Sequence, residues 1–71
     1  SPRYMGEIFE RIIEINAAGV GILMVEQNAR QALALAHRGF VLAGGQNRFT
    51  GTGAELLADP EVAKSFLGGG E

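Results

Sequence analysis

A short polar run, Glu26-Gln27-Asn28, has the residue types and the position that best suit contact with a ligand. It directly follows a continuous apolar run from Val20 to Val25, and helical spacing begins again after it. In open α/β sheets, ligands bind in the crevice outside the carboxyl ends of the strands, and a helix N-terminus there favours an anion. Position alone leaves two interpretations equally open: the run contacts a ligand, or Asn28 simply caps the following helix.

The eleven glycines and one lysine of the chain do not form a phosphate-binding loop of the Walker A type. Such a loop has the pattern G-x-x-x-x-G-K-[ST], in which glycine amides surround the phosphates and the lysine neutralises them. Lys64-Ser65 supplies the final dipeptide, but Ala58 and Ala63 stand where the two glycines are required. The motif is therefore absent from the sequence.

His37, the only histidine, lacks the partners that catalysis or metal binding requires. The chain has no cysteine and no second histidine, and no serine lies near His37 in the sequence. It is predicted to lie at the end of a helix, and its expected role there is structural or incidental. Glu7, Glu10 and Glu14 are likewise expected to form the solvated face of a helix rather than an acid–base pair.

The elements that precede the polar run are predicted to be a helix and a buried strand. Ser1-Pro2 joins a capping serine to a proline at the first helical position, and Gly19 suits a helix end. One apolar helical face is formed by Met5, Ile8, Phe9, Ile12 and Ile13. The run from Val20 to Val25 shows no alternation, which is typical of a strand buried on both faces of a parallel sheet.

Beyond the polar run, the sequence predicts a helix, a β-hairpin and two short helices. Each helix start carries a capping signal: Asn28 with Gln31, Thr52 with Glu55, and Asp59 with Pro60. Gly44-Gly45 separates residues 40–43 from residues 46–50 and indicates a hairpin turn. The whole order is therefore helix, strand, helix, β-hairpin, helix, helix, which is an α/β arrangement.

This arrangement is expected to be one fragment, residues 1–71, of a larger α/β core. One buried strand and one hairpin do not complete a doubly wound sheet, because the run from Val20 to Val25 needs strand neighbours that the chain does not offer. Phe9, Phe40 and Phe66 are expected in the core of the fragment. The start Ser-Pro-Arg-Tyr resembles a cut through a longer protein more than an initiation site or a secretion signal.

Composition limits the chain to one small domain of marginal stability. A domain of this size buries only about 60% of the surface that its unfolded chain exposes, and there is no cysteine for a disulfide. Hydrophobic residues make up 46% and charged residues 20%, which excludes disorder. The six basic residues are scattered and the net charge is −2, so nucleic acid is not an expected partner. No apolar run is long enough to span a bilayer, which leaves a cytoplasmic location as the expectation.

Two motifs occur in order along the chain: V-E-Q-N-A at residues 25–29 and A-E-L-L-A-D-P at residues 54–60. With residues 32–36, 38–42 and 66–68 between and after them, they resemble the C-terminal third of the ATP-binding subunits of branched-chain amino-acid ABC transporters. The resemblance covers the chain from Ser1 to Gly69. It implies that the fragment is the C-terminal part of a P-loop ATPase core.

The resemblance also implies a role for one residue of the polar run. In such subunits, the strand that matches residues 20–25 ends in a switch residue, usually histidine, which contacts the γ-phosphate and positions the attacking water. The matching position here is Gln27. Glutamine can donate a hydrogen bond to a phosphate but cannot carry a proton. Gln27 is therefore the candidate catalytic residue, effective only in the full-length parent.

The remaining machinery of such subunits does not occur in this sequence: Walker A, the glutamine loop, the L-S-G-G signature and the Walker B acid are all absent. The resemblance thus assigns ATP, Mg and hydrolysis to a parent ATPase of an importer for branched-chain amino acids. That parent pairs with a second ATP-binding subunit and joins permease subunits at the inner face of the cell membrane. The fragment alone is expected to be inactive, to bind no cofactor and to self-associate. The alternative is a free-standing α/β interaction module that self-associates through its exposed strand.

Overall fold

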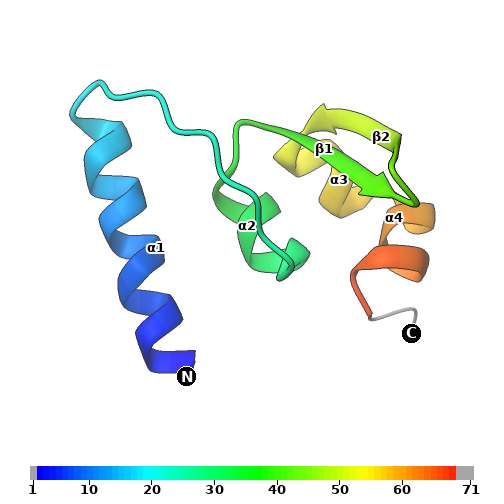
Figure 1. The fold of residues 1–71 in the computed structure, drawn as a ribbon, viewed down its shortest axis with the longest axis horizontal. Coiled ribbons are helices and arrows are strands. Elements are labelled where there is room, and N and C mark those ends of the chain that lie inside the picture. Colours follow the sequence, from blue (N-terminus) through cyan, green and yellow to red (C-terminus); the bar gives the residue numbers. More distant parts are fainter. Residues whose placement is uncertain (1, 69–71) are drawn as a thin grey trace.

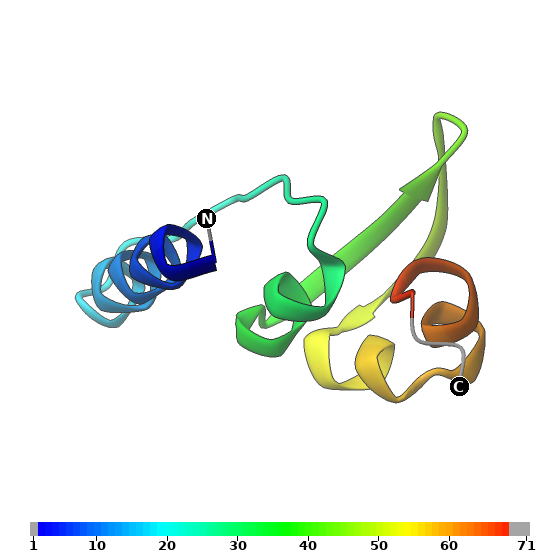
Figure 2. The same cartoon turned by 90° about the horizontal axis from the view of Figure 1, so that it is seen from below.

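The computed structural model describes residues 2–68, which form four helices and one β-hairpin (Figure 1). In chain order the elements are α1 (Pro2–Ala17), α2 (Ala29–Leu35), β1 (Arg38–Ala43), β2 (Gln46–Thr52), α3 (Gly53–Ala58) and α4 (Pro60–Phe66). Both views show α1 to one side, joined by a long irregular segment to the group formed by the other five elements (Figures 1 and 2). The predicted order of helices and hairpin is confirmed.

α1 is the longest described helix, and its end follows the sequence signal. Gly19 lies beyond it with a positive φ of 102°, and its N–H donates a hydrogen bond to the carbonyl of Asn16 at 2.9 Å. Phe9 is buried on the predicted apolar face, whereas Ile13 is exposed. The expected cap, Ser1, lies outside the described residues. Within residues 2–68, no helix combines the length and the apolar character that crossing a membrane requires.

Residues 20–25 do not form the predicted strand. They run as an irregular segment, and the sheet of the described residues holds two strands only, β1 and β2. Leu23 and Val25 are 93% and 97% exposed, whereas Met24 between them is half-buried. A strand forms through hydrogen bonds to a neighbouring strand, and no described residue pairs with this segment in that way. The fold of the described residues is therefore a small α/β arrangement of helices with one hairpin.

The β-hairpin has the expected glycine turn and one irregularity. Gly44 and Gly45 have φ values of 61° and 74°, as a two-residue turn with both central residues left-handed requires. β1 and β2 are antiparallel, and their register shifts by one residue near the turn. Val41 pairs with Phe49 while the next residue of β1 pairs with Asn47, which leaves one extra residue in β2 as a β-bulge.

The hydrophobic core lies between α2, the hairpin, α3 and α4. Leu33, Leu56 and Val62 are buried at its centre. The partly buried residues packed against them are Val41, Phe49, Leu57 and Leu67. The ring of Phe66 meets that of Phe49 edge to face, with centroids 5.8 Å apart. Each of these elements presents one apolar side to a common centre, which holds the five of them together.

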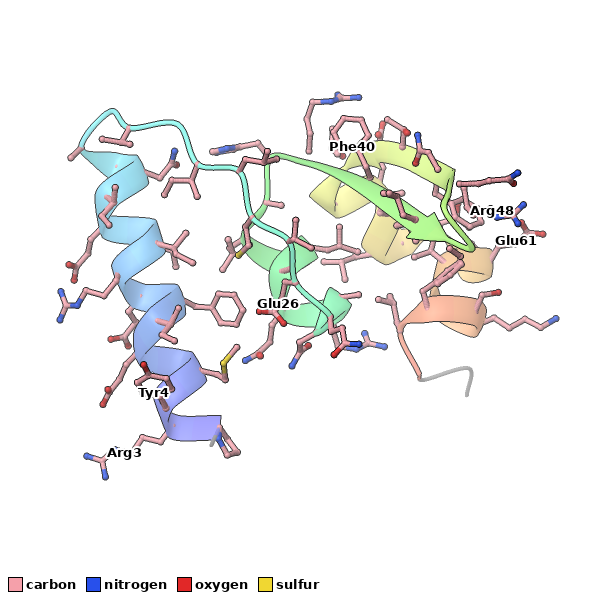
Figure 3. All side chains as sticks on the ribbon, in the orientation of Figure 1. Arg3, Tyr4, Glu26, Phe40, Arg48 and Glu61 are labelled. Atoms are coloured by element: carbon pink, nitrogen blue, oxygen red, sulfur yellow. The ribbon has the colours of Figure 1, made fainter. Side chains whose placement is uncertain are left out.

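One of the three phenylalanines predicted for the core lies on the surface instead. Phe40 is 59% exposed and projects from the outer face of β1, away from α3 and α4 (Figure 3). Exposed and half-buried residues alternate along β1. Strand side chains point to opposite faces in turn, so Phe40 faces outward when Gly39 and Val41 face inward. The core prediction is wrong for Phe40, correct for Phe9, and met in part by the half-buried Phe66.

The starts of α3 and α4 are fixed by the predicted caps. Thr52 and Glu55 form a complete capping box: the Thr52 hydroxyl accepts from the Glu55 N–H at 3.0 Å, and the Glu55 carboxylate accepts from the Thr52 N–H at 2.9 Å. The Asp59 carboxylate accepts from the Glu61 N–H at 2.9 Å, with Pro60 at the first helical position. Both capping predictions are confirmed.

α3 begins directly against the end of α2. A Cβ atom built on Gly53 would overlap the carbonyl oxygens of Leu33 and Ala36, so only glycine fits at this approach. The N–H of Gly53 also donates a hydrogen bond to the carbonyl of His37 at 3.2 Å. The two helices are thus docked backbone to backbone, and the hairpin between them is closed at its base.

Candidate functional site

Gln27 lies just before α2, between two residues that are held by hydrogen bonds. Its own side chain is exposed, and no side-chain hydrogen bond joins it to another described residue. On one side of it, Glu26 Oε1 accepts a hydrogen bond from the backbone N–H of Asn28 at 3.0 Å. Figure 3 shows Glu26 beside the first turn of α2. The polar run therefore has a fixed part, residues 26 and 28, and a free side chain between them.

Asn28 is the N-cap of α2, as predicted. Its side-chain oxygen accepts from the N–H of Gln31 at 3.3 Å, and its Nδ2 donates to Gln31 Oε1 at 2.8 Å. In a complete capping box, the third helical residue would accept from the N-cap backbone. Here Glu26 accepts that N–H instead. Capping thus accounts for Glu26, Asn28 and Gln31, and leaves the side chain of Gln27 without a structural task among the described residues.

An open groove of about 1060 Å³ adjoins Gln27. It lies between α1, residues 22–27, α2 and the outer face of β1. Most of its lining is apolar and includes Ile12, Ile22, Leu23, Val25, Phe40 and Leu42. Glu26, Gln27 and His37 are among its few polar lining residues. The groove brings Gln27 together with the exposed apolar side chains of the irregular segment and of β1.

The other candidate residues of the sequence lie on the surface, as expected. His37 lies beyond the end of α2, because the backbone is already extended at Ala36, and its side chain is exposed. Glu7 pairs with Arg3 at 3.9 Å, and both side chains are well exposed. Such surface pairs contribute about 0–1 kcal/mol. Glu10 and Glu14 are exposed on the same helix, so the interpretation as a solvated face is confirmed.

The residues from 2 to 68 do not fit ATP or magnesium by themselves. Lys64 lies within α4, exposed, and not in a glycine loop. The same part of the chain holds no group of three histidine, aspartate or glutamate side chains that could bind a metal ion. Phosphate charge would therefore find no built site in these residues. Among the residues that the structure describes, Gln27 remains the contact to such a ligand that the sequence predicts.

The sequence did not predict the hydrogen bond between Glu26 and Asn28. It grouped Glu26 with its neighbours as a polar run, and the bond becomes visible only when the turn before α2 is known. The available signal is a carboxylate two residues before an N-cap, a spacing at which a side chain can accept the backbone N–H.

Known proteins that resemble this chain include ATP-binding proteins of transport systems. The high-affinity branched-chain amino acid transport ATP-binding protein BraG of Pseudomonas aeruginosa is 45% identical over 69 residues, which are 97% of this chain and 30% of that protein. The lipopolysaccharide export system ATP-binding protein LptB of Escherichia coli K12 is 35% identical over 60 residues, or 83% of this chain and 25% of LptB.

LptB of Acidithiobacillus ferridurans is 32% identical over 62 residues, covering 87% of this chain and 26% of that protein. No family model and no solved structure matches the chain. The chain thus spans less than a third of the length of these relatives, and the matches run along nearly all of its own length.

Proposed function

The chain is homologous to the C-terminal part of ABC transporter ATP-binding proteins, and from this premise we propose that it completes the ATP-hydrolysing subunit of an importer for branched-chain amino acids. The observation that carries the proposal is the 45% identity to BraG along 97% of the chain, against 32–35% to LptB over shorter stretches. The named function of BraG is the one that the proposal transfers. The partners it implies are a second ATP-binding subunit and permease subunits, at the inner face of the cell membrane.

The irregular segment supports a role inside a larger subunit. Leu23 and Val25 are almost fully exposed and lie next to the apolar groove. Exposing a contiguous apolar surface of this kind is unfavourable unless another part of a protein covers it. In the proposal, the rest of the parent supplies that cover, and it also supplies the residues that hold ATP and magnesium.

Within the parent, Gln27 is proposed to donate a side-chain hydrogen bond toward the γ-phosphate and to help hold the attacking water. Two features support this role. The side chain of Gln27 is exposed and free of other described partners. The competing role, capping α2, is filled by Asn28. An amide N–H aimed at developing negative charge is a type of group that accelerates such reactions.

A chimera tests the proposed function. The 69 matched residues of BraG are replaced by the corresponding part of this chain, and ATP turnover and amino-acid uptake are measured with the permease partners of BraG. Turnover within about tenfold of intact BraG is expected, since buried and docking positions of a homologous segment tolerate volume-conserving changes. BraG without the segment is the negative control and should be inactive.

The same replacement in LptB of Escherichia coli separates the two transport systems. The proposal expects the BraG chimera to support transport better than the LptB chimera. A functional LptB chimera beside an inactive BraG chimera would contradict the assignment to amino-acid import. Inactivity of both chimeras, with folding intact by circular dichroism, would contradict the role as a completing segment.

The chain alone is predicted not to bind Mg-ATP. Among the described residues there is neither a lysine in a glycine loop nor a cluster of acidic groups, so the phosphate charge stays uncompensated. Calorimetric titration of the 71-residue chain with Mg-ATP is the measurement. Binding in the micromolar range would show that the chain holds a nucleotide site of its own.

A further inference from the structure

The residues on either side of Gln27 form a continuous set of hydrogen bonds that does not include Gln27. Glu26 Oε1 accepts the N–H of Asn28, and Asn28 is joined to Gln31 by two further bonds. The bond from Glu26 spans two residues and therefore bends the backbone around Gln27 into a closed turn. We call these three residues, Glu26, Asn28 and Gln31, the 26–31 clamp. Its geometry fixes the backbone from which the Gln27 side chain projects.

On the C-terminal side of Gln27, the clamp continues into α2, which packs against the core. On the N-terminal side, the chain does not pack in this way. α2 carries the buried Leu33, and Arg30 Nη2 donates to the carbonyl of Leu67 at 3.5 Å, just past α4. On the opposite side, Leu23 and Val25 are nearly fully exposed in the irregular segment. The position of Gln27 relative to the core therefore depends on the clamp.

We infer that Glu26 and Asn28 are positioning residues, which act on ATP turnover by holding Gln27 in place. This inference rests on the proposed function of Gln27. Glu26 is half-buried, and its carboxylate accepts a charge-assisted hydrogen bond, which is roughly twice as strong as a neutral one. Without that bond the turn opens and the amide of Gln27 moves. A displacement of about 1 Å at a reacting group can cost about 100-fold in rate.

The test uses the BraG chimera with single substitutions at Glu26 and Gln27 and their combination. Glu26→Ala is expected to lower ATP turnover by about tenfold or more while leaving the KM for ATP within about twofold, since Glu26 positions a group and does not bind the nucleotide. Glu26→Gln keeps an acceptor oxygen and should restore most of the turnover. In a Gln27→Ala background, Glu26→Ala should cause no further loss, because the residue through which it acts is gone.

Asp59→Ala is the matched control for a purely structural effect. Asp59 accepts the N–H of the residue two positions on at 2.9 Å, as Glu26 does at 3.0 Å, but it caps α4. Both alanine variants should lower the melting temperature by a similar amount. Only Glu26→Ala should lower turnover. Equal turnover losses in the two variants would overturn the inference, because the loss would then follow stability alone.

Hydrogen exchange of the 71-residue chain adds a measurement that does not depend on activity. The backbone amide of Asn28 should exchange faster in the Glu26→Ala variant than in the wild-type 71-residue chain. In the Glu26→Gln variant the exchange should again be slow. An unchanged exchange rate in Glu26→Ala would overturn the clamp.

The activity results also separate this inference from the proposed function. Normal turnover of Glu26→Ala beside impaired Gln27→Ala overturns the clamp and leaves the role of Gln27 intact. Normal turnover of Gln27→Ala would contradict the catalytic role of Gln27, and with it the positioning role of Glu26 and Asn28.

Discussion

At the scale of single residues, the structure assigns helix capping and possible ligand contact to different residues of the polar run. The polar run Glu26-Gln27-Asn28 was compatible with ligand contact and with helix capping. Asn28 caps α2 with help from Glu26, and the side chain of Gln27 is exposed with no described partner. Capping a helix with a polar side chain stabilises it by about 0.5–2 kcal/mol, which is reason enough for an asparagine at residue 28. Within residues 2–68, the structure shows no comparable structural reason for a glutamine at residue 27.

Gln27→Ala in the chimera is predicted to lower ATP turnover by about 100- to 1,000-fold, or roughly 3–4 kcal/mol, because one preorganised donor is lost. The KM for ATP should stay nearly constant, since the parent supplies most of the binding. Gln27→His should retain much of the turnover, because histidine can donate from the same place. Turnover and melting temperature of the three proteins are the measurements. An alanine variant with turnover within about twofold would contradict the catalytic role.

Gly53 is the residue at which a small change should most disturb the core. Gly53→Ala places a methyl group against the carbonyl oxygens of Leu33 and Ala36, so we expect a loss of about 1–3 kcal/mol in the free energy of unfolding. Gly6→Ala is the control, because a Cβ on Gly6 meets nothing within 4 Å. Because Gly6 lies inside α1, the Gly6→Ala substitution should raise the free energy of unfolding by about 0.5–1 kcal/mol. Urea unfolding of the chain measures both, and an equally stable Gly53→Ala variant would refute the tight approach.

At the scale of elements, an element could be predicted from the sequence when the interactions that form it lie close together in the chain. The caps of α2, α3 and α4 act within three residues of the chain, and the hairpin turn requires only Gly44-Gly45. These elements were predicted correctly. The strand expected at residues 20–25 was wrong, because pairing depends on a neighbour that the described residues do not contain. The exposure of Phe40 was missed for a related reason, since the face of a strand that becomes buried depends on what packs against it.

The capping box at the start of α3 offers a prediction for an element. Thr52→Ala should cost about 1 kcal/mol in the free energy of unfolding, because the N–H of Glu55 loses its acceptor. Thr52→Ser retains a hydroxyl at the same place and should recover most of this loss. Thermal or urea unfolding of the two variants is the measurement, with the exposed Ser65→Ala as a control. An unaffected Thr52→Ala variant would show that the box adds nothing to stability.

At the scale of the whole molecule, the chain has a packed part and an exposed apolar part. Residues 29–67 share the core of Leu33, Leu56 and Val62. Residues 20–25 and the outer face of β1 line an apolar groove instead. Unpaired extended backbone with apolar side chains recruits other strands. The isolated chain is therefore expected to associate with further copies of itself.

Light scattering at increasing concentration tests this association. The average mass of the wild-type chain should rise with concentration. Leu23→Lys and Val25→Lys should reduce the rise, because each places a charge on the exposed apolar segment. Ala34→Lys adds the same charge at an exposed position of α2 and should not. A wild-type chain that stays a folded monomer at high concentration would contradict the prediction.

The hydrogen bond from Gly53 to His37 has a consequence for the speed of folding. This bond closes the base of the hairpin and brings α3 into contact with α2. In the sequence, only the two strands of the hairpin lie between these helices. Hairpins form in about 1–10 μs, and short loops lose little entropy on closing. Every element of the core thus meets a near neighbour in sequence, a topology that favours fast folding. An irregular segment without strand pairing joins α1 to the other elements, so we expect α1 to dock in a separate and later step.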